Sequence, residues 1–167
     1  HTHHQAHVGR HGSLHLDKAG RPLKVAKDDV QIDDIIAEVR CGNSDWVVYY
    51  YQSKTELRLL KQGNDGLKGM SSALQEKNVN YALLRVEKGA LTSRGIKSET
   101  ERYIFIQWMP PGCSPMLRGA VNSHRKPVRD IFTPFQVELS AESLDELSER
   151  VVFQALRYSL RDVERLS

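Results

Sequence analysis

The sequence predicts an α/β (α+β) fold in which a central β-sheet is covered by helices on both faces. Segments with helical and strand periodicity follow one another in the order helix, two strands, helix, two strands, long helix, strand, helix. Residues 81–86 and 103–108 are almost continuously apolar, which is typical of central strands buried on both sides. The 167 residues, 40% hydrophobic and 27% charged, suffice for one domain with a substantial core.

Residues 1–20 differ from the rest of the chain. We expect them to be a disordered extension or a tag in front of a single domain, residues 21–167. The segment contains six of the seven histidines, which are His1, His3, His4, His7, His11 and His15. It has almost no large apolar side chains with which to join a core. A loose metal site at positions 3–7 is the alternative, but a tag or extension explains the histidines better, so we expect no metal and no cofactor.

The first helix is expected to begin at Asp28 and Asp29, whose carboxylates favour a helix N-terminus, and to end at Gly42. Its apolar residues recur at helical spacing and are Ile32, Ile35, Ile36 and Val39.

Two strands are predicted next, at residues 46–51 and 56–61, because aromatic and β-branched residues are concentrated there. A turn near 52–54 would connect them, and the glycines of 63–66 would end the second strand. A short amphipathic helix follows, with the apolar residues Leu67, Met70 and Leu74.

A long helix is predicted for residues 116–132, after the two central strands and their long connection at 87–102. Ser114 is suited to cap this helix, and Pro115 to occupy its first position. Pro127 should kink or break it, because proline lacks the N–H that a helix interior requires.

The chain is expected to end with a half-buried strand at 135–139 and a final helix. Ser143 and Glu146 have the spacing of a capping box for that helix. Its apolar face would contain Leu144, Leu147 and Val151. Four aromatic residues within the strand segments are expected in the core, namely Trp46, Tyr81, Phe105 and Trp108.

Several strings in a fixed order carry a family resemblance over residues 45–153. They are Asp-Trp-Val-Val-Tyr-Tyr at 45–50, Gly-Leu at 66–67, Tyr-Ala-Leu-Leu-Arg-Val at 81–86, Tyr-Ile-Phe-Ile-Gln-Trp at 103–108, Arg-Gly-Ala at 118–120 and Ser-His at 123–124. Together they resemble the actin-depolymerising-factor homology domain, closest to its coactosin and drebrin-like branch. The resemblance implies a mixed sheet of about five or six strands between helices. It also implies an actin-binding module with no enzymatic activity.

The long helix is the first candidate actin-binding site. Between residues 116 and 129 it has no acidic residue, and its cationic candidates are Arg118, His124, Arg125, Lys126 and Arg129. Because actin filaments are strongly acidic, such a surface would steer and hold them. The alternative is an ordinary solvated helix face.

The second candidate site precedes the central strand 103–108 and contains Arg94, Lys97 and Arg102. By the resemblance, Arg102 occupies the position of a lysine that is important for filament binding in coactosin-like proteins. We therefore expect Arg102 to act as an anchor, whereas the alternative is a solvated turn.

Two departures from the severing members favour binding along the filament side. Those members carry basic residues at the positions of Leu117 and Gly119, and a regulatory N-terminal serine that this chain does not match. The function expected from the resemblance is therefore side binding of filamentous actin without strong severing.

Alternative functions remain open from the sequence. The string Pro-Gly-Cys-Ser-Pro at 111–115 resembles the glia-maturation-factor branch, which regulates branched actin networks. The same basic surface would also suit a scaffold or a module that binds anionic phosphoinositide lipids. The net charge of +3 is too small to predict a nucleic-acid partner.

An enzyme is the least favoured interpretation. Cys113 and His124 are eleven positions apart, about 15 Å or more along a straight helix, which is too far for a catalytic pair. The two cysteines have neither disulfide-framework nor metal-ligand spacing, and no apolar run reaches the length of a membrane span. We therefore expect a monomeric, cytoplasmic and cytoskeleton-associated protein.

Overall fold

The computed structural model describes residues 13–16, 22–25, 32–86 and 101–166, with a seven-stranded mixed sheet at its centre. The strands are β1 (Ser13–Leu16), β2 (Pro22–Val25), β3 (Trp46–Ser53), β4 (Glu56–Gly63), β5 (Asn80–Val86), β6 (Arg102–Trp108) and β7 (Val137–Ala141), in the sheet order β1-β2-β4-β3-β5-β6-β7. The pairs β2–β4 and β6–β7 are parallel, and the other neighbours are antiparallel. The predicted mixed sheet is confirmed, and β3 to β7 are the five strands that the sequence predicted.

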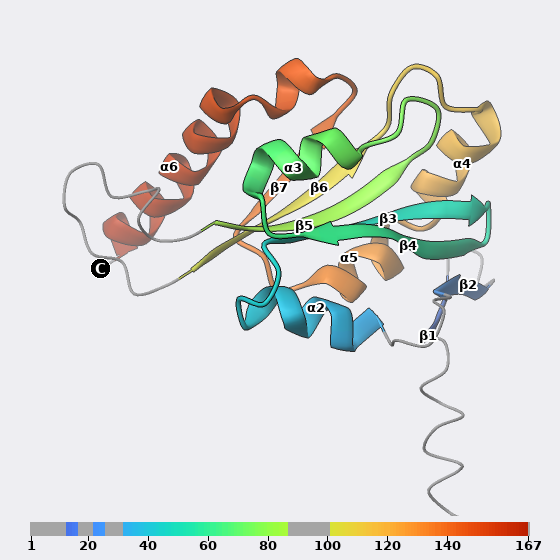
Figure 1. Ribbon diagram of the computed structural model, residues 1–167, viewed down its shortest axis with the longest axis horizontal. Coiled ribbons are helices and arrows are strands. Elements are labelled where there is room, and N and C mark those ends of the chain that lie inside the picture. Colours follow the sequence, from blue (N-terminus) through green and yellow to red (C-terminus); the bar gives the residue numbers. More distant parts are fainter. Residues whose placement is uncertain (1–12, 17–21, 26–31, 87–100, 167) are drawn as a thin grey trace, which may run out of the picture.

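Helices cover both faces of this sheet (Figure 1). One face carries α2 (Ile32–Arg40), α4 (Pro115–Ser123) and α5 (Arg125–Phe132). The other carries α3 (Gly66–Ala73), the 3-10 turn η2 (Leu144–Leu147) and α6 (Glu149–Leu166). The predicted covering of both faces is thus confirmed.

Each face of the sheet has its own hydrophobic core cluster. Along β5 and β6, Tyr81 and Phe105 point to the α2–α4–α5 face, whereas Leu84 and Ile106 point to the α3–α6 face. Because alternate side chains of a strand lie on opposite faces, burial on both sides requires the continuous apolar runs seen in the sequence. The four aromatic residues predicted to lie in the core are at most 5% exposed.

Helix α2 has the predicted inward face. Its four buried residues are Ile32, Ile35, Ile36 and Val39. Asp33 and Asp34 occupy the first turn, and the predicted start at Asp28 and Asp29 lies outside the described residues. Gly42 has φ of 89°, a left-handed conformation that suits glycine and ends the helix as predicted.

The strands β1 and β2 form a sheet edge that was not predicted from the sequence. Ser13–Leu16 falls within the segment expected to be disordered, and that expectation is wrong for these four residues. The two strands are short, and they pair through backbone groups, which no side-chain pattern in the sequence predicts. Leu23 of β2 is fully buried and joins the core on the α2 side. The domain boundary near residue 20 stays a prediction.

The predicted long helix is two helices, α4 and α5, which are divided at His124. The sequence predicted a kink or break caused by Pro127, and the break lies three residues earlier. In a continuous helix the proline ring would clash with the carbonyl group of Ser123, four residues before it. With the break at His124, Pro127 instead lies in the first turn of α5, where proline is tolerated.

Three smaller corrections concern element ends. The β3–β4 turn is at Lys54 and Thr55, and β7 begins at Val137 instead of 135. The Glu146 carboxylate accepts a backbone hydrogen bond from Ser143 as a capping box requires, but it caps the 3-10 turn η2 and not the final helix.

The apolar face predicted for the final helix is also partly wrong. Leu144 is 55% exposed, Val151 is half-buried, and the inward residues are Leu147 of η2 with Val152 and Leu156 of α6. The helix begins at Glu149, five residues later than a helix starting at Leu144, and this shift rotates its inward face.

Candidate functional site

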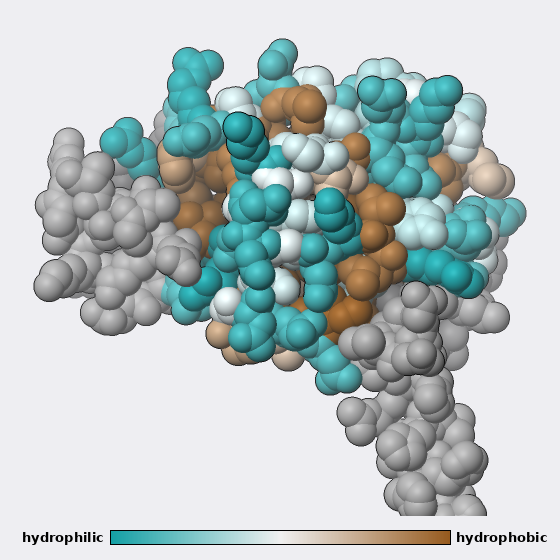
Figure 2. All heavy atoms as spheres, viewed as in Figure 1, coloured by the Kyte–Doolittle hydropathy of each residue, from teal (hydrophilic) through white to brown (hydrophobic). Residues whose placement is uncertain are grey.

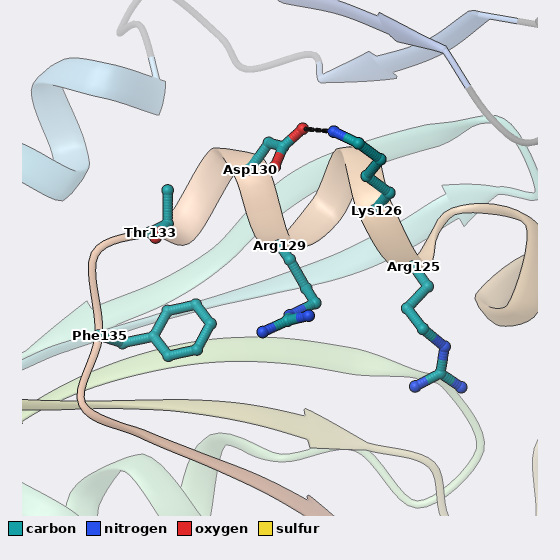
Figure 3. A pocket seen from close by; sticks show the side chains of 6 residues that line it. All are labelled: Arg125, Lys126, Arg129, Asp130, Thr133 and Phe135. Atoms are coloured by element: carbon teal, nitrogen blue, oxygen red, sulfur yellow. Dashed lines mark hydrogen bonds and ion pairs between the residues drawn. The ribbon is translucent and has the colours of Figure 1, made fainter.

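Helix α5 presents a row of cations to solvent. Its inward residues Pro127, Val128, Ile131 and Phe132 are buried against the sheet. The remaining positions are therefore forced outward, and Arg125, Lys126 and Arg129 are all exposed. We call these three residues the basic row. Arg125 and Arg129 extend from one side of the helix and Lys126 from the other (Figure 3).

A surface cavity of about 520 Å³ lies along the basic row. It is lined by Arg125, Lys126, Arg129, Asp130, Thr133 and Phe135. The Arg129 guanidinium lies 5.7 Å from the centre of the Phe135 ring, so the cavity combines positive charge with one aromatic wall (Figure 3). Such a lining suits a partner that carries carboxylate or phosphate groups.

Two members of the basic row form exposed ion pairs. Lys126 Nζ is 2.9 Å from Asp130 Oδ2, and Arg129 Nε is 3.1 Å from Glu138 Oε1. Exposed pairs of this kind contribute little to folding and exchange readily with a partner's charges. Arg125 forms no ion pair with the part of the chain that the structure describes. It is therefore the cation of the row most available to an acidic partner.

Helix α4 adds an apolar element beside the basic row, and we call the exposed residues of α4 and α5 together the strip. Ser114 caps the helix by accepting a hydrogen bond from the Leu117 N–H, with Pro115 at the start, as predicted. Met116 in the first turn is 57% exposed. It lines a hollow of about 320 Å³ together with Lys54, Thr55, Gly119, Ala120, Ser123 and His124.

Met116 was not among the residues predicted to bind actin. Its signal was available, because the buried positions of α4 are Ala120 and Val121 and an apolar residue outside that face must meet solvent. Lys54 and Thr55 could not have been found from the pattern, since only the fold brings the β3–β4 turn beside α4.

Arg118, a predicted binding residue, has a structural contact. Its side chain is half-buried, and Nη2 donates a hydrogen bond to the backbone oxygen of Pro110 at 3.1 Å. The guanidinium thus holds the loop that precedes α4, and only part of it faces a partner.

His124 is not a surface residue, which corrects its prediction as a direct contact. It is 3% exposed, and its Nδ1 is 2.9 Å from the Tyr51 hydroxyl oxygen. The reason is its place in the helical repeat: residue 124 is four positions from both Ala120 and Val128, so it shares their inward face.

The predicted anchor Arg102 is 6% exposed; it is the first residue of β6 and is paired with Val86 of β5. The interpretation as a solvated turn residue is therefore wrong, and a filament could reach the guanidinium only after this region rearranges. Arg94 and Lys97 lie outside the described residues.

Cys113, the nucleophile considered in the sequence, is buried in the structure. Burial raises the pKa of the Cys113 thiol, with Arg118 opposing this more weakly, so the reactive thiolate is disfavoured. Within the described ranges no group of three or more His, Cys, Asp or Glu side chains is placed to hold a metal ion. None of the helices in those ranges is both long and apolar enough to cross a membrane.

Comparison with known proteins identifies a family whose model covers most of the chain. Residues 24–157 match the model of the cofilin/tropomyosin-type actin-binding proteins. The chain belongs to this family. The match includes α4, the basic row and the hollow at Met116, so the strip described above is part of the family's domain.

Coactosins are among the relatives of this actin-binding protein. It is 24% identical to Dictyostelium discoideum coactosin, over 86% of this chain and 90% of the relative. It is 31% identical to Entamoeba histolytica coactosin, over 71% of this chain and 74% of the relative. The crystal structure of Entamoeba histolytica coactosin superposes with a TM-score of 0.66 at 25% identity, over 75% and 91% of the chains. Mouse coactosin, described as an actin filament binding protein, shares the fold, with a TM-score of 0.61 at 18% identity over 75% and 85%.

Proposed function

We propose that this protein binds the side of actin filaments through a strip formed by α4 and α5, without strongly severing them and without catalysing a reaction. The observation that carries the proposal is the exposed basic row, which continues along the chain from the exposed Met116. The coactosin relatives support the filament as the partner.

The two halves of the strip have different physical roles in this proposal. The basic row attracts the acidic filament over a distance of about 8 Å at physiological ionic strength, which raises the association rate. Met116 and its hollow act only on contact, because apolar burial has no long-range component. Binding should therefore weaken as salt rises but not disappear.

The proposed context is a monomer in the cytoplasm that associates with the actin cytoskeleton. A second candidate ligand for the basic row is an anionic phosphoinositide headgroup, which the cavity of about 520 Å³ and its cationic lining favour. Co-flotation with phosphoinositide vesicles tests that candidate, and competition with filaments would show that the two ligands share the row.

Co-sedimentation with filamentous actin tests the main proposal. The parent protein should pellet with filaments, and Arg125→Glu should pellet at least about fivefold less at low salt. Lys68→Glu is the matched control, because Lys68 is exposed on α3, on the opposite face of the sheet. Absence of pelleting by the parent would overturn the function, and equal losses in the two variants would overturn the location of the surface.

A further inference from the structure

Three buried side chains lie under the break between α4 and α5. His124 comes from the break itself, Tyr51 from β3 and Tyr81 from β5. None of the three is more than 3% exposed. The tyrosine rings meet edge to face at 5.6 Å, and the Tyr51 ring lies 5.7 Å from the imidazole.

A chain of hydrogen bonds joins these groups. The Tyr51 hydroxyl oxygen is 2.9 Å from His124 Nδ1 and 2.9 Å from the Tyr81 hydroxyl oxygen. The chain can have either polarity: Tyr81 donates to Tyr51 and Tyr51 to Nδ1, or Nδ1–H donates to Tyr51 and Tyr51 to Tyr81. Tyr51 is the middle member in both cases and cannot be removed without separating the other two.

The position of this chain matters because the backbone at His124 is not helical. His124 has φ of −98° and ψ of 7°, so the direction of α4 relative to α5 depends on how residue 124 is held. The flanking hydrogen bonds, His124 N–H to the Ala120 oxygen and Val128 N–H to the His124 oxygen, tie it to each helix in turn. The imidazole bond to Tyr51 ties it to the sheet.

We propose that His124, Tyr51 and Tyr81 form a joint that fixes the angle between α4 and α5, and so aligns the apolar and basic halves of the binding strip. Met116 lies on one side of the break, and the basic row lies on the other. A partner can engage both at once only when their relative orientation is correct. The inference rests on the proposed function and assigns positioning roles, not contact roles, to the three residues.

The strand β3 offers a matched pair of substitutions. Tyr51→Phe removes the hydroxyl that joins the other two groups. Tyr49→Phe makes the same chemical change two residues away on β3, at a fully buried hydroxyl with no hydrogen-bond partner among the described residues. Tyr51→Phe should weaken filament binding about fivefold because the strip is less preorganised, whereas Tyr49→Phe should bind like the parent.

Hydrogen exchange on the free protein reports the joint without actin. Each variant is measured the same number of degrees below its own melting temperature. In Tyr51→Phe, the amides of His124 and Val128 should then exchange at least about fivefold faster than in Tyr49→Phe. His124→Asn is the second variant, because its side-chain amide can replace Nδ1 as a partner of Tyr51. It should retain more than half of the parent's affinity, and a fivefold loss would contradict the joint.

A double-substitution cycle separates positioning from general destabilisation. Met116→Ser should weaken binding in the parent. In the Tyr51→Phe background it should weaken binding much less, because a misaligned α4 no longer places Met116 against the filament. Equal effects of Met116→Ser in both backgrounds would overturn the joint while leaving filament binding intact. If the parent does not pellet with filaments, the proposed function falls and the joint with it.

Discussion

Arginine has different roles at two places: where β5 ends and β6 begins, which we call the strand base, and on helix α5. At the strand base, Arg85 binds Glu101 through two hydrogen bonds, of 2.8 and 3.1 Å, and its side chain is 11% exposed. On α5, the pair between Arg129 and Glu138 has a similar length of 3.1 Å, but the arginine side chain is 51% exposed. By their distances the two pairs look equivalent. Burial distinguishes them: the Arg85 pair supports the fold, whereas the Arg129 pair is open to solvent and available to a partner.

The rest of the strand-base network explains this difference. The Tyr103 hydroxyl is 2.8 Å from Glu101 Oε2, and the Arg40 guanidinium lies 4.7 Å from the centre of the Tyr103 ring. Arg40 Nη2 also donates to the backbone oxygen of Phe132 at 2.9 Å. The network thus connects α2, β5, β6 and the end of α5, whereas the pairs of the basic row connect only neighbouring surface groups.

The largest expected effect is on stability, from Arg85→Met. Removing the guanidinium leaves the Glu101 carboxylate without its bidentate donor, and hydrogen bonds to charged groups contribute about 1.5–3 kcal/mol. We expect the free energy of unfolding, measured in urea, to fall by roughly 2 kcal/mol. Arg85→Lys should recover only part of this, because lysine cannot bind bidentately. A variant as stable as the parent would remove the distinction between the two regions.

The next effect is on binding, from Arg125→Glu combined with Lys126→Glu. Both side chains are exposed, so the free energy of unfolding should change by no more than about 0.5 kcal/mol. Filament affinity in co-sedimentation should fall about tenfold or more at low salt, and the remaining binding should depend less on salt. A large loss of stability would show that the basic row also supports the fold.

Much of the fold, and part of the candidate site, could be predicted from the sequence. The order of β3 to β7, the face of α2 and the basic row could be predicted, because periodicity and charge are local properties. The burial of Arg102 could not, because the side chains that cover it come together only in the fold. The burial of His124 could have been predicted, since it lies four residues from both Ala120 and Val128 on the inward helix face. The exposure of Met116 could be predicted only once the boundary of α4 is known, since it then follows from the buried face of that helix.

Acid should weaken the strand-base network specifically. Hydrogen bonds from Arg85 and then from Tyr103 lower the pKa of Glu101 from 4.5 to about 2. A carboxyl group whose pKa is depressed in the folded state stabilises the fold above its unfolded pKa, and this contribution is lost as the pH falls through the folded value. Melting curves of the parent and Glu101→Gln should therefore differ at pH 7 and converge between about pH 4.5 and 2. A constant difference over that range would contradict the role of the carboxylate.

The smallest expected effect is a gain, from Asp130→Asn on α5. Asp130 is the acidic member of the exposed pair with Lys126, whose side chains are 56% and 85% exposed. Removing the charge should change stability by no more than about 0.5 kcal/mol, because an exposed i,i+4 pair contributes little. It also frees Lys126 and makes the row one charge more positive, so filament affinity should rise about twofold at low salt and the gain should vanish at high salt. Equilibrium pelleting across a salt series measures both. A decrease in affinity would mean that Asp130 itself contacts the filament, in which case the surface is a mixed-charge interface and not a basic one.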